Sequence, residues 1–397
     1  MILLAGGSGT TPVVPVTPVT PPDPDPVDPD KCGIPGICGN PDTPIVDPSD
    51  APAPVSNLGT VGASTELVSA INNLVTEVYE GPGSATGLQV SQIGQSGVST
   101  GGAAANNDAS AGKRKPFSVW ARAYGTHTNQ EAYDGYDGYR SNMGGLLLAM
   151  DRSKAMGPNS VLSIGGALGY SSNHTNGISN VAGGNPSTID VDGYQLAGYV
   201  TQLTDKYFLL GILGYSFNKF ETERMDNLGQ TFKSEFDGGH AFLNLKGTYD
   251  FMKSGAWTLS GIAQTTFNHL TYDEMVENDL SSGGYKVAID DHNIWTAALG
   301  AKLKYDIISD ANRVFQPEIH GRVYYDILGD RFNMEVSNTN LIPTATEGAK
   351  PDRLSYNIGA GLTMYGIWGV NLTLNYDYTW REHADEHNVS LKARYRF

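Results

Sequence analysis

Residues 388–397 read NVSLKARYRF, and apolar and polar side chains alternate strictly through this run. The apolar positions are Val389, Leu391, Ala393, Tyr395 and Phe397, and the polar positions between them are Ser390, Lys392, Arg394 and Arg396. Because successive side chains of a strand point to opposite faces, the run predicts a strand with one apolar and one cationic face. Such a strand suits a half-buried sheet, or a barrel wall with lipid on one side and water on the other. The two terminal aromatics beside three cations favour the barrel.

The same alternation recurs upstream, in runs that are long for a soluble protein. Strands of soluble proteins have about five to six residues, whereas a tilted membrane strand needs about nine to eleven. The runs reach the larger figure, so we predict an all-β fold, a 12-stranded antiparallel transmembrane β-barrel over residues 117–397. The expected strands are 117–127, 139–151, 160–174, 188–202, 206–219, 231–251, 255–270, 285–308, 313–328, 353–366, 369–381 and 387–397.

Composition agrees with this class. Charged residues make up 17% of the 397 residues, and no run of eighteen or more apolar residues occurs, which excludes a transmembrane helix. Half of each strand of a membrane barrel faces a polar interior, so its average hydropathy resembles that of a soluble protein. The net charge of −16 is uneven, because residues 1–112 hold eleven acids and a single base, Lys31.

The part of the chain before the barrel divides into three segments by composition. Residues 1–60 form an acidic spacer, and 14 of the 21 prolines lie before residue 55. Proline fixes φ and lacks the N–H that a strand ladder requires, so the spacer is expected to be an extended, disordered tail. A peptide ligand for a partner is the sharper alternative. The two cysteines of the chain, Cys32 and Cys38, lie in this spacer and are expected to form a small disulfide loop in an oxidising compartment.

Residues 61–81 contain the one helix candidate, and residues 82–116 form a linker rich in Gly, Ser and Ala. Ser64 is a possible N-cap and Gly81-Pro82 a stop signal. The candidate pore helix carries an apolar seam at spacings of four, three and four, made of Leu67, Ile71, Leu74 and Val78. The helix could plug the barrel, form a coiled coil with another helix through this seam, or pack elsewhere within the same protein.

The start of the barrel region carries a family resemblance. Residues 118–125 read SVWARAYG, followed by Asp134-Gly135-Tyr136, Gly144-Gly145 and Asp151. With the terminal Tyr395-Arg396-Phe397, this order of motifs resembles the translocator barrel of bacterial autotransporters, the type V secretion family, over about 70% of the chain.

The resemblance implies a barrel of twelve strands in the outer membrane of a Gram-negative bacterium. It also implies export of the chain's own N-terminal segment to the cell surface, assembly by the outer-membrane barrel assembly machinery, and Tyr395 and Phe397 as the C-terminal assembly signal. Both barrel ends then lie on the periplasmic side, with short turns such as Ser254-Gly255 and Ile367-Trp368. The long connections become extracellular loops, at 175–187, 221–230, 271–284 and 329–352.

Side chains at the polar alternate positions are expected to point into the lumen, where cations exceed acids. The lumen-facing charged residues that we predict are Arg122, Lys246, Lys302, Lys304, Glu318, Arg322, Lys392, Arg394 and Arg396. These charges could pair with one another and stiffen the wall. Alternatively, the basic lumen could hold the acidic N-terminal segment as it passes, or form an anion-preferring channel.

Enzymatic and metal chemistry find little support in the sequence. No GxSxG elbow, HExxH helix or phosphate-binding P-loop occurs, so no catalytic residue, metal or cofactor is assigned and the chain is predicted not to be an enzyme. His383 and His387, four residues apart, lie in a polar turn. Asn72-Asn73 resembles the self-cleavage site of some autotransporters, but it lies well before the first strand, and a chance Asn pair explains it better.

The partners and alternatives follow from this assignment. Outer-membrane lipid and the barrel assembly machinery are the partners expected of such a barrel. A surface partner of the N-terminal arm or loops is an alternative, and nucleic acid is not expected. Because only about 116 residues precede the barrel, the chain is expected either to be a fragment of a longer protein or to display a short arm. The main alternative function is a small porin or ligand-binding barrel that its N-terminal helix plugs, and a soluble adhesin of β-sandwiches is the third.

Overall fold

A computed structural model describes residues 117–133, 138–157, 160–178, 187–204, 206–225, 229–310, 313–331, 333–339, 343–347, 350–367 and 370–397. Within these ranges the secondary structure is almost entirely β, and no helix is long and apolar enough to cross a membrane. The expected spacer, pore helix, linker and Cys32–Cys38 disulfide lie outside the described residues.

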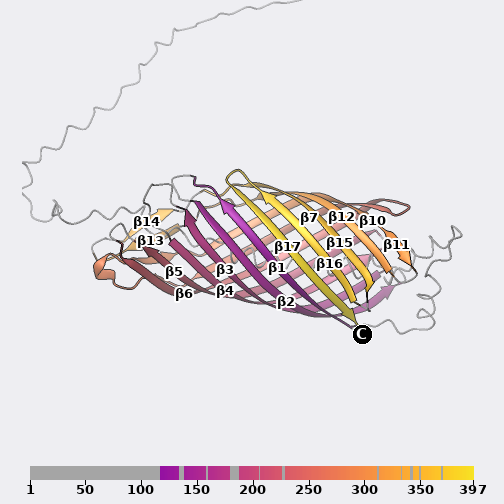
Figure 1. Cartoon of the computed structure of the whole chain (residues 1–397), viewed down its shortest axis with the longest axis horizontal. Helices are drawn as coiled ribbons and strands as arrows, with labels where there is room; N and C mark the ends of the chain where they lie inside the picture. The colour runs from indigo at the N-terminus through magenta and orange to yellow at the C-terminus, as the bar shows by residue number, and fades with distance from the viewer. Residues whose placement is uncertain are drawn as a thin grey trace, which may run out of the picture. The chain divides into compact units, whose positions relative to one another are not determined.

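Twelve long strands form a closed antiparallel barrel (Figure 1). The chain order is also the order around the wall, with β1 paired to β17 and β10 paired to β12 to complete the closure. The predicted 12-stranded fold is therefore confirmed. The barrel strands are β1 (Phe117–Gln130), β2 (Gly138–Gly157), β3 (Ser160–Ile178), β4 (Ser187–Thr204), β5 (Tyr207–Met225), β6 (Thr231–Ser254), β7 (Trp257–Tyr272), β10 (His292–Tyr305), β12 (Arg313–Asp326), β15 (Leu354–Ile367), β16 (Val370–Trp380) and β17 (Ala384–Arg396).

The strand register fixes how steeply the strands tilt. A row of paired residues that leaves β5 at Tyr207 and passes around the barrel through His127 returns to β5 at Glu221, fourteen residues further along. With a rise of about 3.3 Å per residue and a strand spacing of about 4.8 Å, this shear tilts the strands by about 39° from the barrel axis. The tilt is that of a membrane barrel.

The connections differ sharply between the two ends of the barrel. At one end, which we call the short-turn end, the chain reverses within a few residues, and Gly255 has φ 58° in the two-residue turn between Ser254 and Trp257. Both ends of the barrel chain meet there, where Phe117 and Phe397 exchange backbone hydrogen bonds of 3.4 and 3.0 Å. The opposite end, the loop end, carries the longer connections.

Four further strands form a small sheet at the loop end, in the order β14-β13-β9-β8. Its members come from the connections β7–β10 and β12–β15, and β8 is joined to the barrel because Asn278 N–H donates to the Lys233 carbonyl at 2.9 Å. The elements are β8 (Met275–Val276), β9 (Lys286–Ile289), β13 (Asn333–Ser337) and β14 (Thr344–Glu347), with a 3-10 turn at Leu280–Ser282 and a short β11 (Ile307–Asp310) at the other end of the barrel.

The structure corrects three expectations about the strands and loops. A single strand over 285–308 is wrong, because residues 286–289 leave the barrel to pair with β13 and β8, and β10 starts only at His292. The loops expected at 271–284 and 329–352 carry strands of their own. The loops expected at 175–187 and 221–230 are shorter than predicted, because β3 and β5 continue to Ile178 and Met225.

Candidate functional site: the barrel lumen and its rims

The outer face of the barrel is an apolar belt between two rows of exposed aromatic side chains. On β5, Tyr207 and Phe217 mark the two rows, and the ten residue steps from one to the other span about 26 Å along the axis at the tilt given above. This height matches the ~25 Å apolar band of outer-membrane barrels. The row at the short-turn end includes Phe117, Tyr207, Tyr249, Phe251, Trp257, Tyr395 and Phe397, and the row at the loop end includes Tyr170, Tyr194, Phe217, Phe267, Trp295, Tyr325, Tyr356, Tyr376 and Trp380.

Beyond the loop-end aromatic row, the outer face becomes acidic on β4, β5 and β6. The acids are Asp190, Asp192, Glu221, Glu223, Glu235 and Asp237. Lys219 lies between two of them, 3.0 Å from Glu221 and 3.2 Å from Glu235, and both pairs are exposed. The membrane-spanning part of the wall therefore ends below this acidic surface.

The nine charged residues predicted to face the lumen differ in how deeply they are buried. Arg122, Lys246, Lys302, Lys304, Lys392 and Arg394 are buried, Glu318 and Arg322 are nearly so, and Arg396, beside the short-turn end, is half-buried. Arg122 donates to Ser390 Oγ at 2.8 Å and is the register partner of Lys392. Positive charge is thus concentrated along the contact of β1 with β17.

A carboxylate–imidazole chain links charged side chains on β10, β12 and β16. His320 Nε2 lies 2.7 Å from Asp377 Oδ1, and its Nδ1 lies 3.6 Å from Glu318 Oε1. Glu318 faces Lys302 at 3.9 Å, and Asp377 faces Arg322 at 3.6 Å. The charges on this side of the barrel are therefore cross-linked between strands.

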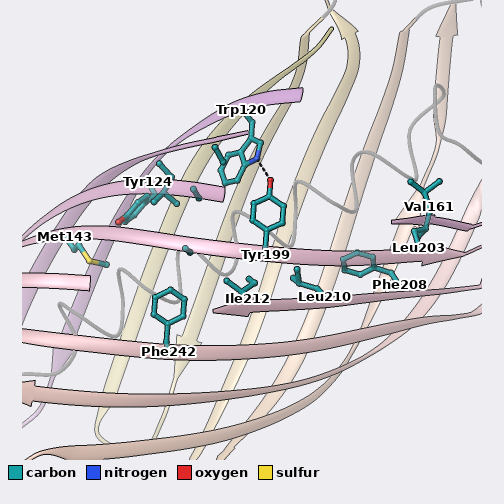
Figure 2. Packing of buried hydrophobic residues seen from close by; sticks show 14 residues of the cluster. Trp120, Tyr124, Met143, Val161, Tyr199, Leu203, Phe208, Leu210, Ile212 and Phe242 are labelled. Carbon is teal, nitrogen blue, oxygen red and sulfur yellow. Dashed lines mark hydrogen bonds between the residues drawn. The ribbon is translucent and has the colours of Figure 1, made fainter. Parts of the chain in front are cut away.

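A second inner contact joins the first and last strands of the barrel to β2 and β4. The Arg394 guanidinium lies 3.2 Å from Asp151 and donates to Ser118 Oγ. Tyr199 O–H donates to the same carboxylate at 3.2 Å, and Trp120 Nε1–H donates to the Tyr199 oxygen at 3.3 Å (Figure 2). All of these side chains are buried. Through them, Asp151 on β2 is connected to β1, β4 and β17.

The inner face of β1–β6 also carries a cluster of buried apolar side chains, which the sequence analysis did not identify (Figure 2). Several of its rings lie over a glycine on the neighbouring strand. A Cβ atom built on Gly165 would lie 2.2 Å from the Tyr199 ring, and one on Gly214 would lie 2.2 Å from the Phe242 ring. The cluster contains Trp120, Tyr124, Met143, Leu147, Ala149, Val161, Ala167, Ala197, Tyr199, Leu203, Phe208, Leu210, Ile212 and Phe242.

At the loop end, a buried ion pair attaches the small sheet to β5. Arg224 donates two hydrogen bonds to Glu277, at 2.8 and 2.7 Å, and one to the Gly283 carbonyl at 3.0 Å. Its guanidinium carbon lies 4.5 Å from the ring centroids of both Phe232 and Tyr285. Bidentate geometry and stacking on two aromatic rings make this a strong anchor.

The rim beside the β1–β17 contact contains His383, one of the two histidines in the polar turn noted above. His383 Nδ1 lies 2.9 Å from Asp352 Oδ1, and this hydrogen bond raises the pKa of His383. The ring stacks on Tyr133 at 4.4 Å between centroids. His387 does not join it, because its Nδ1 lies 2.8 Å from the Tyr376 hydroxyl instead.

The comparisons with known proteins agree with this geometry. A family model described as the autotransporter beta-domain matches residues 119–377. Among curated proteins, the outer membrane protein B of Rickettsia japonica is 21% identical over 296 residues, and that of Rickettsia conorii is 22% identical. Each match covers 71% of this chain and 17% of the relative, so the chain spans about a sixth of the length of these proteins.

Similar solved structures are translocator barrels. The translocator domain of the autotransporter NalP from Neisseria meningitidis has a TM-score of 0.54 at 16% identity, covering 73% of this chain and 92% of that one. The beta domain of the Bordetella autotransporter BrkA has a TM-score of 0.52 at 17% identity, covering 71% of this chain and 100% of that one. At these identities the likeness concerns the fold.

Proposed function

Because this chain belongs to the autotransporter beta-domain family, and so lies in the bacterial outer membrane in contact with its lipid, we propose that its barrel anchors residues 1–116 there and carries them to the cell surface. The position of Phe117 carries the proposal. It begins β1 at the short-turn end, beside Phe397. A segment that joins the barrel at the short-turn end and is displayed beyond the loop end has to cross the membrane. The lumen of the barrel is a route for that crossing.

The length of the preceding chain is sufficient for this path. An extended chain advances about 3.3 Å per residue, so about eight residues cross a belt of about 26 Å. The 116 residues before Phe117 exceed this many times over. The Gly, Ser and Ala-rich composition of residues 82–116 suits a segment that must thread a narrow passage in an extended form.

Charge complementarity supports the same direction of passage. Inner cations concentrate on β1 and β17, where Arg122 and Lys392 are register partners and Arg394 follows on the same face. Residues 1–112 hold eleven acids against one base. An acidic segment entering at the short-turn end would meet this basic strip first, and attraction between opposite charges would favour entry.

We further propose that Tyr395 and Phe397 form the signal by which the outer-membrane barrel assembly machinery recognises the chain. Both side chains are about half exposed on the outer face, and their rings lie 6.3 Å apart. A surface partner of the N-terminal arm or of the loops belongs to the same proposal. That the chain is not an enzyme stays a prediction.

Export can be tested by labelling cysteines on intact cells with a membrane-impermeant maleimide. The variant Cys32→Ser leaves Cys38 as the single thiol. Two cysteine-free backgrounds serve as controls, one with S281C in the loop-end connection and one with S254C at the short-turn end; both positions are exposed. We expect Cys38 to be labelled on intact cells, or in the medium if the arm is released, as S281C is on the cells.

Export is contradicted if Cys38 is labelled only after the cells are lysed, as the S254C control is. Conductance in planar bilayers separates the porin alternative. We expect the full chain to conduct little and a chain lacking residues 1–115 to conduct more, because an occupied lumen passes few ions. A large steady channel in the full chain would favour the porin.

A further inference from the structure

Three connections meet at the loop end beside the closure of the barrel, and they bring metal-ligating side chains together. We propose that Asp352, Glu382 and His383 form a binding site for a divalent transition-metal ion of the zinc class. One ligand atom from each of the three lies within 4.8 Å of the other two. Among the residues that the structure describes, no other group of three such side chains meets this criterion. The site is independent of the translocation function proposed above.

The backbone holds the ligands in place. His383 N–H donates to Asp352 Oδ2 at 3.0 Å, and the His383 carbonyl accepts from the backbone N–H of Glu131 at 2.8 Å. Arg381 N–H donates to the Ala384 carbonyl at 2.8 Å, which closes the turn that carries Glu382 and His383. The three ligands therefore come from two connections, and a third connection, β1–β2, supports the histidine.

The orientation of the imidazole is fixed from both its edge and its face. The ring of Tyr133 stacks on it with an interplanar angle of 10°, and the Asp352 carboxylate contacts Nδ1. The Tyr133 ring and the Asp352 carboxylate therefore hold the imidazole of His383 beside the other two ligands. Glu382 is exposed, so its side chain can rotate toward an ion without disturbing packing.

The donor set selects the class of ion. Zinc binds histidine nitrogen and carboxylate oxygen at about 2.0–2.2 Å, which sets ligand atoms about 3.4 Å apart in tetrahedral geometry. To reach this spacing, the exposed Glu382 side chain rotates inward, and the His383–Asp352 hydrogen bond of 2.9 Å opens slightly. An imidazole donor suits zinc and its neighbours in the transition series, whereas calcium and magnesium prefer sites made of oxygen alone.

A bound ion would link the connection before β15 to the turn between β16 and β17. Since Tyr133 and Glu131 tie that turn to the β1–β2 connection, the ion would tighten the rim on both sides of the β1–β17 contact. A three-ligand site also leaves a coordination position for water or for a donor from a partner.

The test is isothermal titration of the full chain in detergent with zinc chloride, in a background with Cys32→Ser and Cys38→Ser because thiolates also bind zinc. We expect one ion per chain, a loss of affinity of at least about tenfold in Glu382→Gln and His383→Gln, and no competition from excess magnesium. Glu382→Gln is the decisive variant, since its exposed side chain is not needed for folding.

His174→Gln is the matched control. His174 Nδ1 lies 2.6 Å from Asp190 Oδ1, so it is also a histidine beside a carboxylate, but it belongs to no group of three ligands. Its replacement should leave the titration unchanged. Zinc binding that persists in both Glu382→Gln and His383→Gln, or the absence of saturable binding below about 100 µM, an affinity of about −5.5 kcal/mol, would overturn the proposal.

Discussion

The inner faces of β3–β5 and of β10–β17 line the same lumen but have opposite chemistry. From Val161 to Thr222, the inward positions of β3–β5 hold no charged side chain, and they include rings such as Tyr199 and Phe208. The inward positions of β10, β12, β16 and β17 carry the charged network around Glu318 and His320 and the cations of β17. The outer faces of the two halves, in contrast, are both apolar.

The difference shows which constraints act on each surface. Lipid contacts the whole circumference, so every strand must present apolar side chains outward. No single solvent contacts the whole inner surface, so different strands can be stabilised by different inward side chains. The uncharged half packs rings against glycines across neighbouring strands, while the charged half joins its strands through ion pairs and hydrogen bonds.

The largest effect is expected from Phe242→Ala on β6. Phe242 is almost fully buried and its ring covers Gly214. Removing a buried phenylalanine side chain costs about 3–5 kcal/mol, because the cavity does not collapse completely. The free energy of unfolding can be measured by urea titration in lipid vesicles, followed by heat-modifiable gel migration.

Leu243→Ala is the control on the same strand. Leu243 faces outward and is 41% exposed, so lipid fills the space that its side chain leaves. The expected loss is smaller than that of Phe242→Ala. Equal losses in the two variants would show that packing of the β6 ring against Gly214 of β5 does not stabilise the barrel.

The next largest effect is expected at the junction of the two halves. Asp151→Ala removes the carboxylate that Arg394 and Tyr199 share. Breaking a buried ion pair by removing one partner costs about 3 kcal/mol or more. The same unfolding assay applies. Glu221→Ala, which breaks an exposed pair with Lys219, should cost much less, because solvent screens an exposed ion pair.

The sequence predicted the barrel strands well because lipid imposes a regular pattern on them. Alternation in runs such as residues 388–397 needs no knowledge of distant partners, and it predicts Arg122 and Lys302, which are buried, at inward positions. The small loop-end sheet was not predictable in this way. Its strands are two to five residues long, too short to show a period, and their pairing depends on segments about fifty residues apart.

The specific contacts of the site were beyond sequence reasoning for a similar reason. Asp151 and Arg394 are 243 positions apart, and only closure of the barrel brings them together. The uncharged half did leave a signal, because Phe208, Leu210 and Ile212 make both faces of β5 apolar. His320 gave none, since a single histidine at an inward position does not reveal its contacts with two carboxylates.

A moderate effect is expected from Gly214→Ala, which tests how closely rings approach the wall. The new Cβ would lie 2.2 Å from Phe242 Cζ, so the ring must move. Overpacking of this kind costs about 1–3 kcal/mol. Gly198→Ala is the matched control, because a Cβ there meets nothing within 4 Å. A loss of stability in both variants would point to a general sensitivity of the strands to alanine instead.

The smallest effect concerns pH at the loop end of the charged half. His292 begins β10, three residues beyond the aromatic row at Trp295, and burial lowers its pKa below the ordinary 6.5, against the opposing charges of Asp330 and Asp326. The folded rim therefore binds this proton less well than the opened rim does. The contribution of neutral His292 to the stability of the rim is fully present above pH 6.5 and declines as the pH falls below it.

Hydrogen exchange of residues 286–294 tests this expectation. Exchange should accelerate below pH 6.5 beyond the intrinsic rate. His292→Gln should remove this pH dependence, while His174→Gln should retain it. An unchanged pH profile in His292→Gln would assign the effect to other groups.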